Sequence, residues 1–153
     1  MKSDNCIKIE FLSKSCNEGF ARVAIAALAS QSDPTLEEIS EIKTAVSEAV
    51  TNAIVHGYCD KEGVIYITAR LKKGKLTVTV RDKGCGIENI EKAREPMFTT
   101  GNENERSGMG FTIMESFMDK VTVRSEIGRG TKVTMVKQLT DTENGDTNGI
   151  CTR

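Results

Sequence analysis

The sequence predicts an α+β protein, a two-layer sandwich in which helices pack on one face of a mixed, mostly antiparallel sheet. Two long segments, residues 17–30 and 35–57, carry apolar residues at the spacings of three and four that are typical of amphipathic helices. Two further pairs of segments alternate apolar and polar residues across short turns, which predicts hairpins of antiparallel strands. Because each helix must bury its apolar face, we expect the sheet to form the second layer.

The composition is that of one globular domain. The chain has 153 residues, of which 38% are hydrophobic and 28% are charged, so it is long enough to bury a core. We expect a domain over residues 1–139 and a disordered tail over residues 140–153, because the tail is polar and has almost no apolar content. The net charge of -1 gives no electrostatic reason to expect nucleic-acid binding.

Three features favour a soluble protein in the cytoplasm. Residues 1–10 carry charges where a signal peptide needs an apolar run. The longest apolar stretch, residues 23–29, is too short to cross a membrane. The five cysteines are odd in number and contain no CxxC pair, which favours free thiols in a reducing compartment over disulfides or a zinc site.

The helix signals are strongest in the first third of the chain. A strand is expected over residues 7–11, and Asn17 is the candidate N-cap of the helix that follows. In the second helix, Thr35 and Glu38 have the spacing of a capping box, and Gly57 is the expected stop. The predicted apolar positions are Phe20, Val23, Ala24, Ala27 and Leu28 in the first helix, and Leu36, Ile39, Ile42, Val46, Val50 and Ala53 in the second.

The rest of the chain alternates short elements with turns. The expected elements are a hairpin of residues 64–71 and 76–80, a glycine-rich turn over 82–87, a short helix over 90–94, a polar loop over 95–107, a helix over 111–118, and a hairpin of residues 120–126 and 131–136. We expect the polar loop to be mobile, since it has little periodicity.

Several nucleotide-binding and catalytic motifs are absent. The sequence contains no G-x-x-x-x-G-K-[ST] run, no G-x-G-x-x-G run and no H-R-D or D-F-G signature, which excludes a P-loop protein and a eukaryotic-type protein kinase. The single histidine, His56, cannot form a histidine-rich metal site.

A polar stripe runs along the second helix. Thr44, Glu48, Asn52 and His56 are spaced by four, so they lie on one side of the helix. A carboxylate beside an amide oxygen suits Mg²⁺, which takes oxygen ligands and keeps several waters. The alternative is an ordinary solvated helix face, and the stripe taken alone favours that alternative.

Two glycine-containing motifs follow further along the chain. Asp82-x-Gly84-x-Gly86 comes at the end of a strand, where the carboxylate could accept a hydrogen bond from an adenine amine and the glycines could admit a flat ligand. Residues 107–110 open a helix whose bare N–H groups could bind phosphate, and Arg106 could neutralise its charge. A simple turn and a glycine hinge are the respective alternatives, but the order of the parts is more specific than any one of them.

The motifs Glu48-x-x-x-Asn52, Asp82-x-Gly84-x-Gly86, Gly108-x-Gly110 and Gly130-Thr131 resemble the sequence boxes of the GHKL ATPase superfamily. Within it, the chain is most similar to the sporulation anti-sigma factors of the anti-sigma-F type. The runs that carry this closer resemblance are residues 46–54, 98–100 and 105–115. The resemblance extends over the whole chain up to the tail and implies the Bergerat-type ATP-binding fold.

The resemblance implies ATP/ADP and Mg²⁺ as cofactors and a role for each matching residue. Asn52 would hold Mg²⁺, and Glu48 would be the catalytic base that orients or deprotonates a serine. Asp82 would bind the adenine amine, with Thr131 nearby, and Arg106 would act on the terminal phosphate. The other nucleotide-binding positions are His56, Gly84, Gly86, Thr99, Thr100, Ser107, Gly108, Met109 and Gly110.

The resemblance also implies partners. A protein of this kind is a homodimer that inhibits a sigma factor of the sigma-F type and phosphorylates a serine of an anti-anti-sigma antagonist. Arg22, Glu105 and Arg106 would lie where these partners bind.

Four alternatives remain open at the level of sequence. A stress-response anti-sigma kinase would have the same catalytic parts and a different sigma partner. A histidine-kinase catalytic domain would need a phosphorylatable histidine outside the site. A sequestering module would bind ATP without using it, and Glu48 is the residue that such a module would not need. A structural α+β domain with turns that mimic the motifs is the fourth alternative.

Overall fold

The structure is a computed structural model that describes residues 4–59, 61–94 and 110–140. In chain order its elements are β1 (Asn5–Leu12), α1 (Cys16–Ala29), the 3-10 turn η1 (Ser30–Ser32), α2 (Leu36–Asn52), the π-helical turn η2 (Ala53–Gly57), β2 (Val64–Lys72), β3 (Lys75–Asp82), α3 (Ile90–Ala93), α4 (Gly110–Phe117), β4 (Lys120–Glu126) and β5 (Gly130–Gln138). The predicted strands, hairpins and helices are all present, and their ends differ from the predicted ones by at most two residues, except that the regular α-helix α2 ends at Asn52 instead of the expected Gly57.

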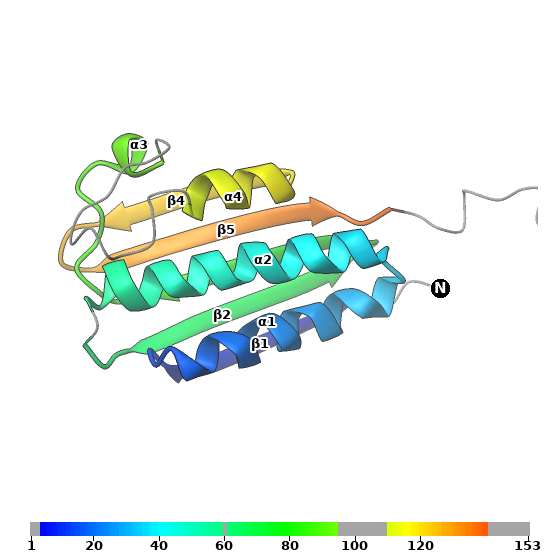
Figure 1. Cartoon of the computed structure of the whole chain (residues 1–153), viewed down its shortest axis with the longest axis horizontal. Helices are drawn as coiled ribbons and strands as arrows, with labels where there is room; N and C mark the ends of the chain where they lie inside the picture. The colour runs from blue at the N-terminus through cyan, green and yellow to red at the C-terminus, as the bar shows by residue number, and fades with distance from the viewer. Residues whose placement is uncertain (1–3, 60, 95–109, 141–153) are drawn as a thin grey trace, which may run out of the picture.

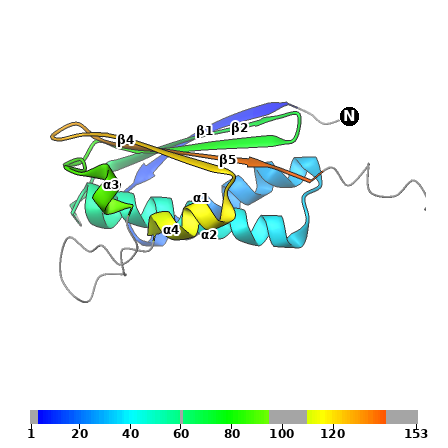
Figure 2. The same ribbon diagram turned by 90° about the horizontal axis from the view of Figure 1, so that it is seen from above.

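The predicted fold class is confirmed. Five strands form one sheet in the order β1-β2-β3-β5-β4, and every strand pair in the described part of the chain is antiparallel. The helices α1, α2 and α4 cover one face of this sheet, and the other face carries no described helix (Figures 1 and 2). The chain is therefore a two-layer sandwich.

The core between the layers is aliphatic, as the low aromatic content requires. Alternate residues of β2 and β3 are buried beneath the helices, which is the period-two pattern of a sheet with one covered face. The largest fully buried side chains are Ile25, Ile42, Ile65, Ile67, Leu71, Leu76, Met114, Met135, Leu139, Val46, Val50 and Val78.

The apolar face of α1 was predicted correctly at Leu28 but wrongly at most of the other positions. The buried residues are Ala21, Ile25, Ala26, Leu28 and Ala29. Phe20 and Val23, which were expected in the core, have 60% and 57% of their surface exposed. Because α1 has apolar residues around most of its circumference, their spacing does not determine which side packs on α2. The expected N-cap was also wrong, since Ser15 precedes the helix and Asn17 instead donates to the Leu12 carbonyl at 2.9 Å.

The helix α2 begins with the predicted capping box. The amide of Glu38 donates to Thr35 Oγ1 at 3.1 Å, and the amide of Thr35 donates to Glu38 Oε2 at 2.9 Å. Of its predicted apolar face, Ile42, Val46, Val50 and Ala53 are buried and Ile39 is half-buried. Leu36 is 89% exposed because it lies in the first turn, beyond the edge of the core.

The same carboxylate joins α2 to the end of β5. Glu38 accepts hydrogen bonds from the amide of Thr140, at 2.8 Å, and from its hydroxyl. Burial alone would raise the pKa of Glu38, but the hydrogen bonds from Thr140 and Thr35, with Lys137 nearby, hold it below its usual value of 4.5. The half-buried pair of Lys137 and Glu41, at 2.8 Å, reinforces this contact. The rest of the predicted tail lies outside the described residues.

The two ends of the sheet differ in the residues that they bring together. The end near Thr140 is closed by these hydrogen bonds and ion pairs. At the opposite end, η2 and the turn after β3 lie together, and the register pairs Asp82 with Thr131. The second end therefore gathers the residues that the sequence motifs predicted for the site. No helix in the described residues has the length and apolar character needed to cross a membrane.

Removal of the capping hydroxyl is expected to weaken the fold measurably. The change Thr35→Ala should lower the free energy of unfolding by about 1 kcal/mol, because a first-turn amide loses its acceptor. Urea denaturation of the full chain measures this value. Glu37→Gln, in the same turn and exposed, is the matched control and should change stability by less than about 0.5 kcal/mol. Equal stability of the two variants would contradict the role assigned to the cap.

Candidate functional site

One end of the candidate site is formed where α4 meets α2. A Cβ atom placed on Gly110 would lie 3.0 Å from Nδ2 and 3.2 Å from Oδ1 of Asn52, and 3.3 Å from Oε2 of Glu48. Gly110 is the first residue of α4, so the helix N-terminus lies directly beside this carboxylate and amide. The structure thus brings together three residues that the sequence predicted for the site, from segments about sixty positions apart.

The adenine-binding candidate, Asp82, ends β3 beneath the η2 turn. Its residue exposure is only 5%, and its Oδ1 accepts a hydrogen bond from the Gly84 amide at 2.9 Å. Its carboxylate faces Gly57, where an added Cβ would lie 2.7 Å from Oδ2. A side chain at position 57 would therefore collide with the carboxylate, and glycine lets η2 pack this closely against Asp82.

The surroundings of Asp82 change its acidity. Burial raises the pKa of this carboxyl above its usual value of 3.8, and the amides of Gly84 and Thr131 offset only part of the effect by hydrogen bonding to the charged form. The ionised carboxylate is therefore held at a cost to the folded state. Perturbed pKa values of this kind cluster at functional sites.

The turn after β3 is held by backbone contacts on both sides. On one side, the amide of Cys85 donates to the Gly57 carbonyl at 2.9 Å, and Gly84 lies so close to that carbonyl that a Cβ would clash with it. On the other side, Gly86 has a φ of +82° and packs against the backbone of Glu126. These contacts explain why the motif needs glycine at both positions.

Hydroxyl groups complete this anchoring. Ser125 Oγ accepts from the Ile87 amide at 2.7 Å and lies 2.8 Å from Thr131 Oγ1. Thr131 is buried and pairs with Asp82 across β3 and β5. The predicted proximity of Asp82 and Thr131 is therefore present.

The π-helical turn η2 is a feature that the sequence pattern did not reveal. The regular α-helix ends at Asn52, and the amide of Tyr58 donates to the Ala53 carbonyl at 3.0 Å, the i to i+5 pattern of a π-turn. Such turns occur frequently at functional sites. His56 is half-buried in this turn, and its carbonyl accepts from the Cys85 thiol at 3.2 Å. Gly57, noted from the sequence only as a helix stop, is the residue that contacts Asp82.

Seven of the predicted site residues lie outside the described part of the chain. They are Thr99, Thr100, Glu105, Arg106, Ser107, Gly108 and Met109. Their roles remain predictions. Arg22 is described and lies on the exposed side of α1, 3.5 Å from Glu18, with 46% of its side chain exposed. The structure does not place Arg22 in the nucleotide site.

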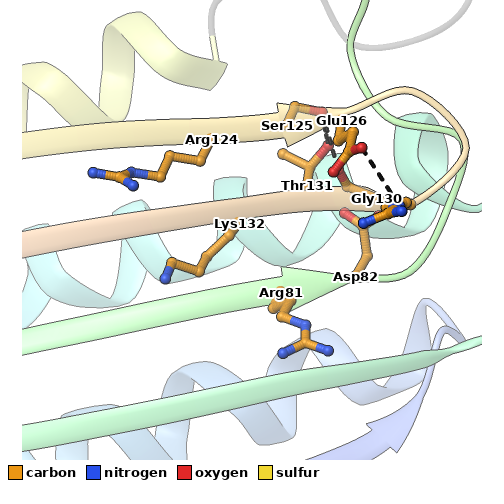
Figure 3. A pocket seen from close by; sticks show the side chains of 9 residues that line it. Arg81, Asp82, Arg124, Ser125, Glu126, Gly130, Thr131 and Lys132 are labelled. Carbon is orange, nitrogen blue, oxygen red and sulfur yellow. Dashed lines mark hydrogen bonds and ion pairs between the residues drawn. The ribbon is translucent and has the colours of Figure 1, made fainter.

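A basic concavity opens on the sheet near the turn between β4 and β5. Figure 3 shows Arg81, Lys132 and Arg124 on three adjacent strands, where the register places them side by side. Asp82, Ser125 and Thr131 also line this concavity. It therefore adjoins the candidate site at the end of β3 and the start of β5.

Comparison with known proteins identifies the class to which this fold and site belong. The family model of the histidine kinase-like ATPase domain matches residues 17–137. These residues include Glu48, Asn52, Asp82, Gly110 and Thr131. The chain is thus a histidine kinase-like ATPase domain of the GHKL type, as the sequence predicted.

Curated relatives define the branch. The anti-sigma F factor of Clostridium perfringens strain SM101 is 57% identical over 137 residues, which cover 89% of this chain and 98% of that protein. The anti-sigma F factor of Clostridium acetobutylicum is 58% identical over 136 residues, covering 89% and 95% respectively. That of Thermoanaerobacter sp. strain X514 is 56% identical over 139 residues, covering 91% and 97%. The chain belongs to the anti-sigma F factor family.

A solved structure agrees at the level of the fold. The RsbU and RsbW domains of Rv1364c from Mycobacterium tuberculosis superpose with a TM-score of 0.63 at 22% identity, covering 88% of this chain and 32% of that one. The similarity shows that the sandwich described above is shared with a distant relative.

The residues present fit a nucleotide with a metal ion. No group of three or more histidine, cysteine, aspartate or glutamate side chains in the described ranges could hold a metal on its own. Mg²⁺ usually keeps several waters and is held by one or two protein groups plus substrate phosphates. Glu48 and Asn52, beside the N-terminus of α4, match that requirement, and a helix N-terminus favours phosphate.

Neutralising Asp82 is expected to change how stability depends on pH. The folded-state pKa of the Asp82 carboxyl is higher than its pKa in the unfolded chain. As the pH rises from the unfolded-state pKa to the folded-state pKa, the free energy of unfolding falls, and it stays lower at higher pH. Asp82→Asn lacks this loss. Its free energy of unfolding relative to the wild type should therefore increase from pH 3.5 to pH 7.

Urea denaturation of both proteins at several pH values measures that difference. Asp33→Asn, exposed and at the far end of the molecule, is the control and should show no such trend. A difference that shrinks toward neutral pH would contradict the assignment of Asp82 as a buried, destabilised carboxylate.

Proposed function

We propose that this chain is an anti-sigma factor that uses Mg²⁺ and ATP to phosphorylate a serine of an antagonist protein, and that it binds a sigma factor of the sigma-F type. The observation that carries the kinase half is the meeting of Glu48, Asn52 and Gly110 at the start of α4. The name shared by relatives at 56–58% identity supports the sigma-factor half.

One end of the site would bind the base. Asp82 is a buried acceptor, so it would take a hydrogen bond from the exocyclic amine of adenine. Gly84 and Gly86 keep the turn close to η2 and β4, which holds Asp82 in position. A base with a carbonyl at that position, such as guanine, would bring two acceptors together and bind less well.

The other end would perform the transfer. Bound ATP would supply the phosphoryl group, and Mg²⁺ would lower the repulsion between its oxygens. Asn52 would hold the metal through its amide oxygen, and Glu48 would accept the proton of the attacking serine hydroxyl. Phosphoryl transfer depends mainly on positioning and electrostatics, so a carboxylate fixed beside a helix N-terminus is suited to the task. Arg106, Ser107, Gly108 and Met109, together with Thr99 and Thr100, would complete the phosphate end.

The partner surface is proposed to include α1. Arg22 is exposed there, and Phe20 and Val23 on the same helix are more than half exposed although they are large and apolar. Exposed apolar residues beside a charge are common at protein interfaces. We propose that α1, with Glu105 and Arg106, contributes to binding of the partners and that the chain acts as a homodimer.

Two alternatives differ from this proposal in measurable ways. A sequestering module would bind ATP and its sigma factor without transferring phosphate. A histidine-kinase domain would transfer phosphate to a histidine, and the only one in the chain is His56, half-buried in the η2 turn.

Replacement of the proposed base separates catalysis from binding. Glu48→Gln should keep ATP and sigma-factor binding within about twofold, since the amide preserves shape, yet lower the rate of antagonist phosphorylation by about 100-fold or more. Transfer of label from γ-labelled ATP measures the rate, and calorimetry measures binding. The matched control is Glu37→Gln, which removes an exposed carboxylate from the same helix. Phosphorylation at the wild-type rate would show that Glu48 is not the base.

Replacement of Asp82 tests the base-binding end independently. Asp82→Asn should weaken ATP binding by about 10- to 100-fold, which corresponds to the roughly 1.5–3 kcal/mol of a hydrogen bond to a charged group. Calorimetry on the folded variant measures the affinity, and Asp33→Asn again serves as the control. Unchanged affinity for ATP would place the adenine elsewhere.

A further inference from the structure

Two thiols lie side by side at the adenine end of the site. Cys59 follows η2 and Cys85 belongs to the turn after β3, and their Sγ atoms are 3.8 Å apart although 26 positions separate them in sequence. Both residues are exposed and free. The nucleotide chemistry proposed above assigns no role to either thiol.

Backbone contacts hold the two thiol-bearing segments together. The Cys85 amide donates to the Gly57 carbonyl at 2.9 Å, and the His56 carbonyl lies 3.2 Å from the Cys85 sulfur and 3.7 Å from the Cys59 sulfur. Cys59 has a left-handed φ of 52°, which a non-glycine residue adopts only when its surroundings stabilise it. The proximity of the sulfurs is therefore a consequence of the fold at η2.

We propose that Cys59 and Cys85 form a reversible dithiol–disulfide site beside the nucleotide site. Its location at the adenine end rests on the proposed function, whereas the pairing of the thiols does not. A disulfide needs the sulfurs at about 2.05 Å, so they must approach from van der Waals contact. The close contact between Gly57 and Gly84 prevents the turn after β3 from moving toward η2. The two sulfurs must therefore approach through rotation of the cysteine side chains and movement of the segment around Cys59.

The oxidant is a low-molecular-weight disulfide, and it oxidises the two cysteines by two successive thiol–disulfide exchange steps. One cysteine thiolate attacks the disulfide, which forms a mixed disulfide and releases one small thiol. The second cysteine then attacks the protein sulfur of that mixed disulfide, which forms the Cys59–Cys85 bond and releases the second small thiol. The two protons lost by the cysteines are carried by the two small thiols, and a reducing dithiol reverses the sequence.

The environment of Cys85 influences the rate of this exchange. Burial first, and then the neighbouring Cys59 thiol, raise the pKa of Cys85, so this residue stays protonated near neutral pH. The pair is therefore stable as two thiols until an oxidant is present, and exchange should become faster as pH rises.

The two outlying cysteines provide an internal comparison. Cys6 and Cys16 are also exposed and free, but they lie on β1 and at the start of α1, without a second thiol within bonding range among the described residues. A disulfide reagent can modify them only as mixed disulfides, whereas at Cys59 and Cys85 the intramolecular second step converts the adduct into a cross-link.

The test treats the full-length chain with oxidised glutathione, followed by peptide mapping under non-reducing conditions. We expect a linked peptide containing Cys59 and Cys85, formed at least about tenfold faster than glutathione adducts at Cys6 or Cys16, because its second step is intramolecular. Cys59→Ser and Cys85→Ser should each leave a glutathione adduct on the remaining thiol, while Cys6→Ser should leave the link unchanged. Glutathione adducts on Cys59 and Cys85 without a link between them in the wild type would overturn the proposal.

A second arm separates this proposal from the kinase proposal. Saturating Mg²⁺ and ATP should slow formation of the link by about fivefold or more, because a bound base covers the turn that carries Cys85. A link that forms at the same rate in a chain shown to bind ATP would overturn the location of the pair at the adenine end. Failure to bind ATP would instead count against the proposed kinase, and peptide mapping would still decide the pairing of the thiols.

Discussion

The site depends on one close contact, in which the backbone of η2 meets the turn after β3. The amide of Cys85 donates to the Gly57 carbonyl, and glycine at positions 57 and 84 lets the two segments touch without side chains between them. This contact packs Gly57 against the carboxylate of Asp82, which is 5% exposed. It also places Cys85 beside Cys59. The proposed adenine recognition and the proposed thiol pairing therefore depend on the same contact.

The opposite end of the sandwich makes that contact possible. There the Glu38 carboxylate caps α2 and binds Thr140, and Lys137 pairs with Glu41, so α2 is fixed to β5 at one end. A helix anchored in this way has a defined position along the sheet. Its other end can then change to a π-turn and still meet the end of β3. Stability and function are consequently divided between the two ends of one helix.

Most of the fold followed from the sequence, because strands with one covered face alternate strictly and the capping box is a local signal. The buried side of α1 could not be predicted from the sequence, because that helix is apolar nearly all round and only its contact with α2 selects the side that is buried. The order of the motifs predicted that Glu48, Asp82 and Gly110 belong to one site. The π-turn and the proximity of Cys59 and Cys85 depend on tertiary contacts, so no periodic pattern in the sequence predicts them.

The most direct test of the central claim follows the γ-phosphoryl group of ATP. The purified chain is mixed with Mg²⁺, γ-labelled ATP and a candidate anti-anti-sigma protein, and the labelled residue is identified by mass spectrometry. Label on a serine of the antagonist is the result that this account predicts. Label on His56, or tight ATP binding with no transfer to any protein, would contradict it.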